Sequence, residues 1–250
     1  MKKLMALFSL LLISVLTLSS GYYAGAAELV ENGDFRTGDF GGWTRDNQTE
    51  CEGNWLIYSG SETPGSMSSI LPPPSGAFAA VTDEFISESC SLLLYQDITV
   101  PEGAGQVHCS AVVYVRNTIE DYIIGNGLEL SPNKNQQYRV DLMDPDAPLY
   151  DVGAGVIQNL FQTVEGDPQS IGYTTIEFDL TAFAGQTVRL RAASVNNEGQ
   201  LFSSIDEVSC VTENNESIPT LSEWGMIAAG AGLMIVGVLF AIKRKRAQAV

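Results

Sequence analysis

The chain has 250 residues, of which 45% are hydrophobic and 17% are charged, and its formal net charge is −17. Basic residues gather at the two ends, so residues 28–217 hold 7 basic and 29 acidic residues, a net charge of −22. Such a surface repels phosphate backbones and anionic lipid head groups, which argues against nucleic-acid binding. The simplest role for these acids is to keep a secreted β-protein soluble.

The first 27 residues have the pattern of a secretory signal peptide. Lys2 and Lys3 precede an apolar stretch from Leu4 to Leu18, and small residues close the segment at Ala26 and Ala27. The apolar stretch is shorter than the ~20 residues that a permanent membrane helix needs. We therefore expect export by the general secretion machinery and cleavage by signal peptidase after Ala26 or Ala27.

Residues 28–211 read as a single all-β domain. Apolar and polar residues alternate in short runs that are separated by Gly, Pro, Asn and Asp, and no stretch has the period and length of a helix. The pattern predicts an antiparallel jelly-roll β-sandwich. The expected strands lie within residues 28–35, 54–60, 77–84, 89–100, 106–117, 136–144, 155–164, 173–181, 186–196 and 202–211.

Two strands and one turn carry specific expectations. In residues 106–117 the alternation turns Cys109 inward and His108 outward. The last strand is expected to close the core through Ile205, Val208 and Cys210. The sequence AGQTV at residues 184–188 predicts a hairpin between the strands on either side of it.

All four cysteines lie in the exported part, where an oxidising compartment favours disulfides. Four cysteines allow three pairings. Cys51 and Cys90 form the first candidate pair if both precede strands. Cys109 and Cys210 are expected to face inward, either bridged or as small buried hydrophobic residues. Short cysteine spacing is absent, so a zinc site is not expected.

Three stretches of the body resemble the galactose-binding-like jelly-roll modules found in carbohydrate-binding proteins and in secreted bacterial proteins with sorting tails. These stretches are LVENGDFRTGDFGGWT near the start, PPPSGAFAAVTDE with LLLYQDITVP in the middle, and FDLTAFAGQTVRLRAASVNNEGQLFSSIDEVSC at the end. The resemblance covers nearly the whole body, although its motifs are mainly structural. It implies a binding domain with the same sandwich fold.

The resemblance also implies a structural calcium ion between the first and last strands. Asn32, Asp34 and Asp206 match the family's ligand positions, and oxygen ligands are what Ca²⁺ requires. Arg36 stands where the family commonly has an acidic ligand. The alternative is that Asp34 and Asp206 only make turn and backbone hydrogen bonds.

Sugar binding by such modules needs flat aromatic faces with polar groups beside them. Four aromatic residues are candidate glycan contacts, each with core packing as its alternative role: Trp55, Tyr58, Tyr122 and Tyr138. Their polar neighbours in the sequence are Asn117, Gln137 and Arg139.

The sequence does not suggest a catalytic site. The only histidine, His108, lies on a strand without an evident catalytic partner. Acidic pairs such as Asp83 with Glu84, or Asp144 with Asp146, could serve glycoside hydrolysis only at the right spatial separation. Such pairs are expected on solvated loops of a chain this acidic, so we do not expect an enzyme.

The C-terminal part, residues 218–250, follows a polar spacer at residues 212–217. An apolar stretch at residues 225–242 predicts a transmembrane helix, and the basic cluster after it is expected to stay cytoplasmic. The basic cluster consists of Lys243, Arg244, Lys245 and Arg246.

The octet IPTLSEWG stands before this helix and is more specific than an anchor requires. Motif, apolar span and basic end in this order resemble the IPTL-CTERM sorting signal, a relative of the PEP-CTERM class. The motif residues are Ile218, Pro219, Thr220, Leu221, Ser222, Glu223, Trp224 and Gly225. The resemblance implies recognition and cleavage by an exosortase-like membrane transpeptidase.

Together these features predict a protein that is exported, held briefly in the inner membrane with its body outside, and then displayed at the cell surface or released. We expect the body to bind glycan, such as extracellular polysaccharide, or matrix. A purely structural surface or biofilm-matrix protein and a glycan-active enzyme are the alternatives.

Overall fold

The computed structural model describes residues 26–48, 51–84, 89–130 and 133–213, together with 230–235, 237–239 and 241–244. The chain divides into two compact units at residue 214, and each unit is described by itself. All buried hydrophobic residues of the described part lie between Val30 and Cys210. The first unit therefore has a hydrophobic core of its own.

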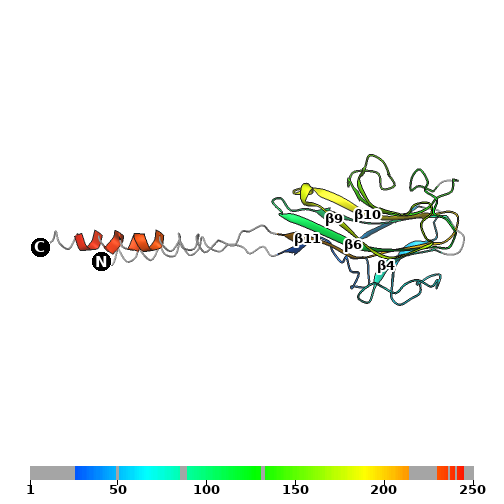
Figure 1. Cartoon of the computed structure of the whole chain (residues 1–250), viewed down its shortest axis with the longest axis horizontal. Helices are drawn as coiled ribbons and strands as arrows, with labels where there is room; N and C mark the ends of the chain where they lie inside the picture. Colours follow the sequence, from blue (N-terminus) through cyan, green and yellow to red (C-terminus); the bar gives the residue numbers. More distant parts are fainter. Residues whose placement is uncertain are drawn as a thin grey trace. The chain divides into compact units, whose positions relative to one another are not determined.

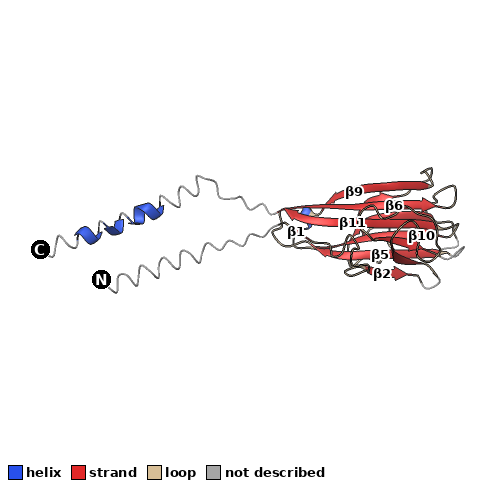
Figure 2. Cartoon of the chain, turned by 90° about the horizontal axis from the view of Figure 1, so that it is seen from below, coloured by secondary structure: helices blue, strands red, loops and turns tan. Residues whose placement is uncertain are grey.

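Two antiparallel sheets form the first unit, as the alternating sequence pattern predicts (Figures 1 and 2). The six-stranded sheet contains, in spatial order, β3 (Asn54–Tyr58), β4 (Ala79–Asp83), β11 (Leu201–Glu213), β6 (Gln106–Asn117) and β9 (Ser170–Asp179), with β1 (Ala27–Glu28) paired to β11. The five-stranded sheet contains β2 (Thr44–Asn47), β5 (Cys90–Thr99), β10 (Thr187–Asn196), β7 (Gln136–Met143) and β8 (Val156–Gln162). This arrangement is a β-sandwich.

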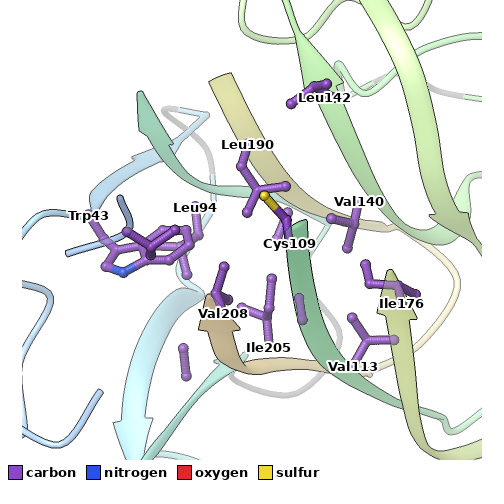
Figure 3. Close-up of a cluster of buried hydrophobic side chains, with 14 of the residues drawn as sticks. Trp43, Leu94, Cys109, Val113, Val140, Leu142, Ile176, Leu190, Ile205 and Val208 are labelled. Carbon is purple, nitrogen blue, oxygen red and sulfur yellow. The ribbon is translucent and has the colours of Figure 1, made fainter. Parts of the chain in front are cut away.

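The core lies between the inner faces of the two sheets. Leu94 and Leu190 of the five-stranded sheet belong to the same buried cluster as Val113 and Ile205 of the six-stranded sheet (Figure 3). Trp43, which follows the Gly41-Gly42 turn, is also buried in this cluster. Burying these side chains is the main favourable contribution to folding.

β11 contains a bulge that explains an irregularity in its sequence. Ile205 and Val208 are three residues apart, yet both pack in the same core cluster, whereas a regular two-residue alternation would place them on opposite faces. The pairing with β6 shifts between Asp206 and Ser209, and Glu207 has a positive φ of 50°. The extra residue restores the inward direction for Val208 and Cys210.

The expected hairpin at residues 184–188 is wrong. β9 pairs with β6 in one sheet, whereas β10 pairs with β5 and β7 in the other. The connection includes the short 3₁₀ helix η1 (Thr181–Phe183) and passes from one sheet to the other. The same turn residues could join two paired strands of one sheet or carry the chain from one sheet to the other. Only the tertiary pairing of the strands distinguishes these two cases.

Loops cover much of the outer face of each sheet. The loop between β3 and β4 covers Tyr58, and Ile70 of this loop forms a second apolar cluster with Tyr58 and Phe202. The connections on either side of β7, residues 118–135 and 144–155, cover the five-stranded sheet and bury Leu93 and Ala193. This cover is why every residue of β7 is buried.

Several expected segments lie wholly or partly outside the described residues. These are residues 1–25 of the signal peptide, residues 214–217 of the spacer, the sorting motif 218–225, and Lys245 and Arg246. Residues 230–235, 237–239 and 241–244 are helical, and Lys243 and Arg244 are exposed. Among the residues that the structure describes, no helix is long and apolar enough to cross a membrane.

Candidate functional site

The four aromatic residues expected to contact glycan are buried. Trp55, Tyr122 and Tyr138 are 0% exposed and Tyr58 is 2% exposed. Trp55 and Tyr138 face the core, with ring centroids 6.5 Å apart, while the loop between β3 and β4 covers Tyr58. None of these rings offers a free face on which a sugar could stack, so the structure makes them packing residues.

The polar neighbours of these aromatics are also engaged within the protein. Arg139 donates two hydrogen bonds of 2.7 Å to Asp141, and Gln137 donates to Asn135. Asn117 donates to the backbone oxygen of Asp121. These groups stabilise the sheet and its covering loops.

Both disulfides are present, and the pairing Cys51–Cys90 is confirmed. Cys109 and Cys210 occupy opposite positions on β6 and β11 and form the second bridge. Both lie in the hydrophobic core, as their inward positions in the alternation predict. The described residues contain no free cysteine.

His108 is exposed on β6, as expected from the alternation. Its Nδ1 lies 3.7 Å from Oδ2 of Asp179. The hydroxyl of Thr181 and its backbone N–H lower the pKa of Asp179, and His108 adds a smaller effect. The side chains of His108 and Asp179 are 57% and 52% exposed, so the pair lies on the outer surface of the six-stranded sheet, away from the cavity described below.

The turn that carries Asn32 and Asp34 packs against the bulge of β11, which carries Asp206; these three are the residues expected to hold calcium. Gly33 approaches β11 so closely that its backbone oxygen accepts a hydrogen bond from the N–H of Val208. Asp206 is only 1% exposed, and neither carboxylate oxygen accepts a hydrogen bond of normal geometry. Oδ1 of Asn32 is likewise buried without a partner.

Burial raises the pKa of Asp206 to about 8, and the backbone N–H of Glu207 offsets this only in part. A bare buried carboxylate is costly unless a proton or a cation compensates its charge. Asp34 differs, because Arg36 forms an ion pair with it at 3.1 Å. Asp206 and Asn32 therefore fit a cation better than Asp34 does.

In the parts of the chain that the structure describes, charged and sulfur ligands do not form a metal site by themselves. No group of three or more histidine, cysteine, aspartate or glutamate residues is placed there so that it could hold a metal ion. A cation at Asp206 would thus depend on amide and backbone oxygens for its remaining ligands.

A cavity of about 690 Å³ lies between the two loops that cover the five-stranded sheet. Its volume falls within the usual range for small-molecule sites. One wall is built by residues 124–129 and 133–135, and the other by Pro148 and residues 150–152. The polar lining includes Asn126, Glu129, Lys134, Tyr150 and Asp151.

Tyr150 is the only aromatic residue among the described residues that line this cavity. It is half-buried, and its hydroxyl donates a hydrogen bond of 2.5 Å to Asp46. Burial raises its pKa, with the nearby carboxylates of Asp46 and Glu129 adding to the effect. The phenol therefore stays neutral, and its ring combines an apolar face with a polar tip.

Buried groups hold both walls of the cavity in place. Arg191, which is fully buried, donates to the backbone oxygens of Leu149 and Asp151 and to the carboxylate of Asp141. On the other wall, the side chain of Asn135 accepts from the N–H of Gly125 and donates to the oxygen of Gly127. The cavity is thus shaped by contacts that leave little freedom for its loops.

Sequence reasoning missed the cavity residues, because none of them belongs to a motif. The signal that could have found them is the length of the two connections, residues 118–135 and 144–155. Most loops between strands of compact domains are shorter, and long ones are often functional. Asp144, one of the acids considered for catalysis, lies in the second connection and caps its turn by accepting a hydrogen bond from the N–H of Asp146.

No protein-family model matches this chain, and no curated protein sequence matches it significantly. Among solved structures, TmCBM61 in complex with β-1,4-galactotriose is similar at 14% identity and a TM-score of 0.43, covering 75% of this chain and 99% of that one. The K3 cleaved adhesin domain of Lys-gingipain from Porphyromonas gingivalis W83 has 14% identity and a TM-score of 0.45, with coverage of 75% and 99%. The Stig cyclase Fisc from Fischerella sp. TAU has 17% identity and a TM-score of 0.41, with coverage of 76% and 98%. With TM-scores below 0.5, these likenesses leave the function of this chain to be argued from its own residues.

Proposed function

We propose that this protein is an exported, non-catalytic glycan-binding protein whose ligand occupies the cavity around Tyr150. The observation that carries the proposal is the cavity itself, which is large enough for a small oligosaccharide and is walled by two anchored loops. The aromatics predicted from the sequence are not part of it.

The lining suits a sugar. The ring of Tyr150 can cover the apolar face of a pyranose, while the amide of Asn126 and the carboxylates of Glu129 and Asp151 can bind hydroxyl groups. Ile124, 40% exposed at the edge of the cavity, adds apolar contact area. Because the walls are held by buried hydrogen bonds, little ordering free energy is lost on binding.

Export and sorting complete the proposal. The two disulfides support an oxidising compartment outside the cytoplasm. The signal peptide and the motif at residues 218–225 support secretion, transient anchoring in the inner membrane and cleavage by an exosortase-like transpeptidase. Display at the cell surface or release would follow.

A structural calcium ion at the β11 bulge is part of the same proposal. Asp206 and Asn32 would hold it, because their buried side-chain oxygens accept no hydrogen bond of normal geometry. The ion would supply the positive charge that the buried carboxylate of Asp206 lacks, and so would fix the first turn of the domain against its last strand.

The binding claim can be tested with a glycan array on the β-domain, residues 26–213, with and without calcium. Tyr150→Ala should reduce the affinity for any glycan that binds by about tenfold, since stacking on one aromatic ring contributes on this order. Tyr173→Ala is the matched control, because Tyr173 is also half-buried and hydrogen-bonded but lies on the other sheet. It should leave the affinity unchanged.

Binding to no glycan at all would sink the proposal and favour a structural matrix protein without a small ligand. Cleavage of a bound glycan would instead favour the glycan-active enzyme. Equal effects of Tyr150→Ala and Tyr173→Ala would place the glycan site outside the cavity.

A further inference from the structure

Most of the charged side chains in and beside the cavity are acidic. The carboxylates of Glu129 and Asp151 line it, and Asp46 accepts the hydrogen bond of Tyr150 beside it. Backbone N–H groups of Gly153 and Gly155 lower the pKa of Asp151, so this carboxylate remains ionised in moderately acidic solution. Three acidic side chains therefore lie in or beside the cavity that Tyr150 lines.

The positive charges nearby are already paired. Nζ of Lys134, the one lysine between residues 28 and 217, lies 2.5 Å from the carboxylate of Glu198. Arg191 and Arg139 share the buried carboxylate of Asp141 behind the cavity wall. Their guanidinium groups are directed to this carboxylate and to backbone oxygens, which leaves the paired Lys134 as the one cation in the described lining of the cavity.

We infer that the cavity prefers glycans that carry protonated amino groups, such as partly or fully deacetylated amino sugars. The inference rests on the proposed glycan-binding function and names the class of sugar. An ammonium group would be attracted both to the face of Tyr150 and to the carboxylates of Glu129 and Asp151. A sugar carboxylate would instead be repelled by Glu129 and Asp151, and the ammonium of Lys134 in the described lining is already paired with Glu198.

The net charge of the exported body favours the same class of ligand. With 29 acidic and 7 basic residues between positions 28 and 217, the protein attracts cationic polymers over a distance and repels acidic polysaccharides. This long-range attraction is not specific, and it weakens as ionic strength rises. Any preference among glycans that remains at moderate salt must therefore come from contacts within the cavity.

Calorimetry on the β-domain tests the inference with three β-1,4-linked tetrasaccharides at about pH 5.5 and moderate ionic strength. The first is a tetramer of glucosamine, the second is its fully N-acetylated counterpart, and the third is a tetramer of a uronic acid. We expect the glucosamine tetramer to bind about tenfold more tightly than the acetylated one, because several partly exposed ion pairs together contribute this much. The uronate should bind most weakly.

Glu129→Gln removes one cavity charge without changing the size of the side chain. We expect it to weaken binding of the glucosamine tetramer about threefold to fivefold, and to weaken binding of the acetylated tetramer less, because the amide oxygen of glutamine still accepts a hydrogen bond from a sugar hydroxyl. Glu177→Gln is the matched control, since it makes the same change in net charge at an exposed position of β9 on the other sheet. It should leave both affinities unchanged.

A linear polyamine of similar charge separates recognition from simple attraction. If the polyamine binds as tightly as the glucosamine tetramer, or if Glu129→Gln and Glu177→Gln have the same effect, the inference is overturned. Equal or tighter binding of the acetylated or uronate tetramer overturns it as well, while glycan binding itself stands. If no glycan binds, the proposed function and this inference fail together.

Discussion

Two buried aspartates show how differently the same side chain can be accommodated. Asp83 accepts hydrogen bonds from the N–H groups of Gly65 and Ser66 and from the hydroxyl of Ser66, so it anchors the loop between β3 and β4. Asp206 is equally buried but lacks such donors. Ionisation of its carboxyl group is therefore unfavourable in the folded state, and the free energy of unfolding of the domain depends on pH as a result.

Without calcium, the stability of the β-domain should fall as pH rises from about 4 to 8. Over this range the unfolded Asp206 ionises, while the folded carboxyl, with its pKa of about 8, keeps its proton. The full contribution is present below the unfolded pKa, and it decreases by up to about 1.4 kcal/mol per pH unit. Asp206→Asn should remove this slope in urea unfolding with a chelator present, whereas Asp144→Asn, at an exposed turn, should not.

Calcium gives this prediction a second readout. If Asp206 binds the ion, calcium at pH 8 should raise the urea midpoint of the wild type and leave that of Asp206→Asn unchanged. Equal responses of the two proteins would remove Asp206 from the proposed calcium site.

Substitution of a buried aromatic residue should change stability, whereas substitution of Tyr150 in the cavity should change glycan affinity. Trp55→Phe alters a fully buried core side chain and should lower the free energy of unfolding by about 1–2 kcal/mol. Its glycan affinity, measured on the folded protein, should equal that of the wild type. A loss of affinity comparable to that of Tyr150→Ala would instead indicate that Trp55 contacts the ligand.

At the scale of strands, the central pair of the six-stranded sheet is β6 and β11. The Cys109–Cys210 bridge joins opposite residues of these strands, and its two cysteines are 101 positions apart in the sequence. The Cys51–Cys90 bridge spans 39 positions. Both bridges restrict the unfolded chain, and the longer loop restricts it more.

Replacing Cys109 and Cys210 with alanine should therefore destabilise the domain more than replacing Cys51 and Cys90. Loop-closure entropy gives about 4.7 kcal/mol for the longer loop and about 4 kcal/mol for the shorter one. Urea unfolding of the two double variants measures the order. The opposite order would mean that local packing at Cys51 and Cys90 outweighs chain entropy.

At the scale of the whole molecule, the two ends of the β-domain lie side by side. Ala27 is the pairing partner of Thr212, and Glu28 accepts a hydrogen bond from the N–H of Cys210. β11 continues to Glu213, beyond the expected domain boundary at residue 211. Only residues 214–217 separate this strand from the proposed sorting motif, so processing would occur close to the folded domain.

The sorting proposal predicts a change in mass and location. Replacing Pro219 and Thr220 with alanine should leave a larger, membrane-retained protein, because the transpeptidase would no longer recognise the motif. Intact mass spectrometry and cell fractionation would show it. Replacing Asn214 and Asn215 of the spacer with alanine is the matched control and should leave processing unchanged. An unchanged mature mass and location of the motif variant would refute sorting through this motif.

Much of the fold could be predicted from the sequence, since alternation is a local property. It placed most strands within a few residues, including β6 at residues 106–117, and it turned Cys109 inward and His108 outward. β2 was missed because its sequence, TRDN, is polar throughout. Edge strands with little buried surface carry no hydrophobic pattern to recognise.

The sequence by itself determined the all-β class, the inward cysteines and the acidic character of residues 28–217, because each follows from composition or from a period of two. Only the tertiary structure decided which sheet each strand joins and how the loops cover the outer faces. That cover buries Tyr58 beneath one loop and, on the other sheet, leaves Tyr150 at a cavity among carboxylates. Burial of this kind depends on residues far apart in the chain, and no local period encodes it.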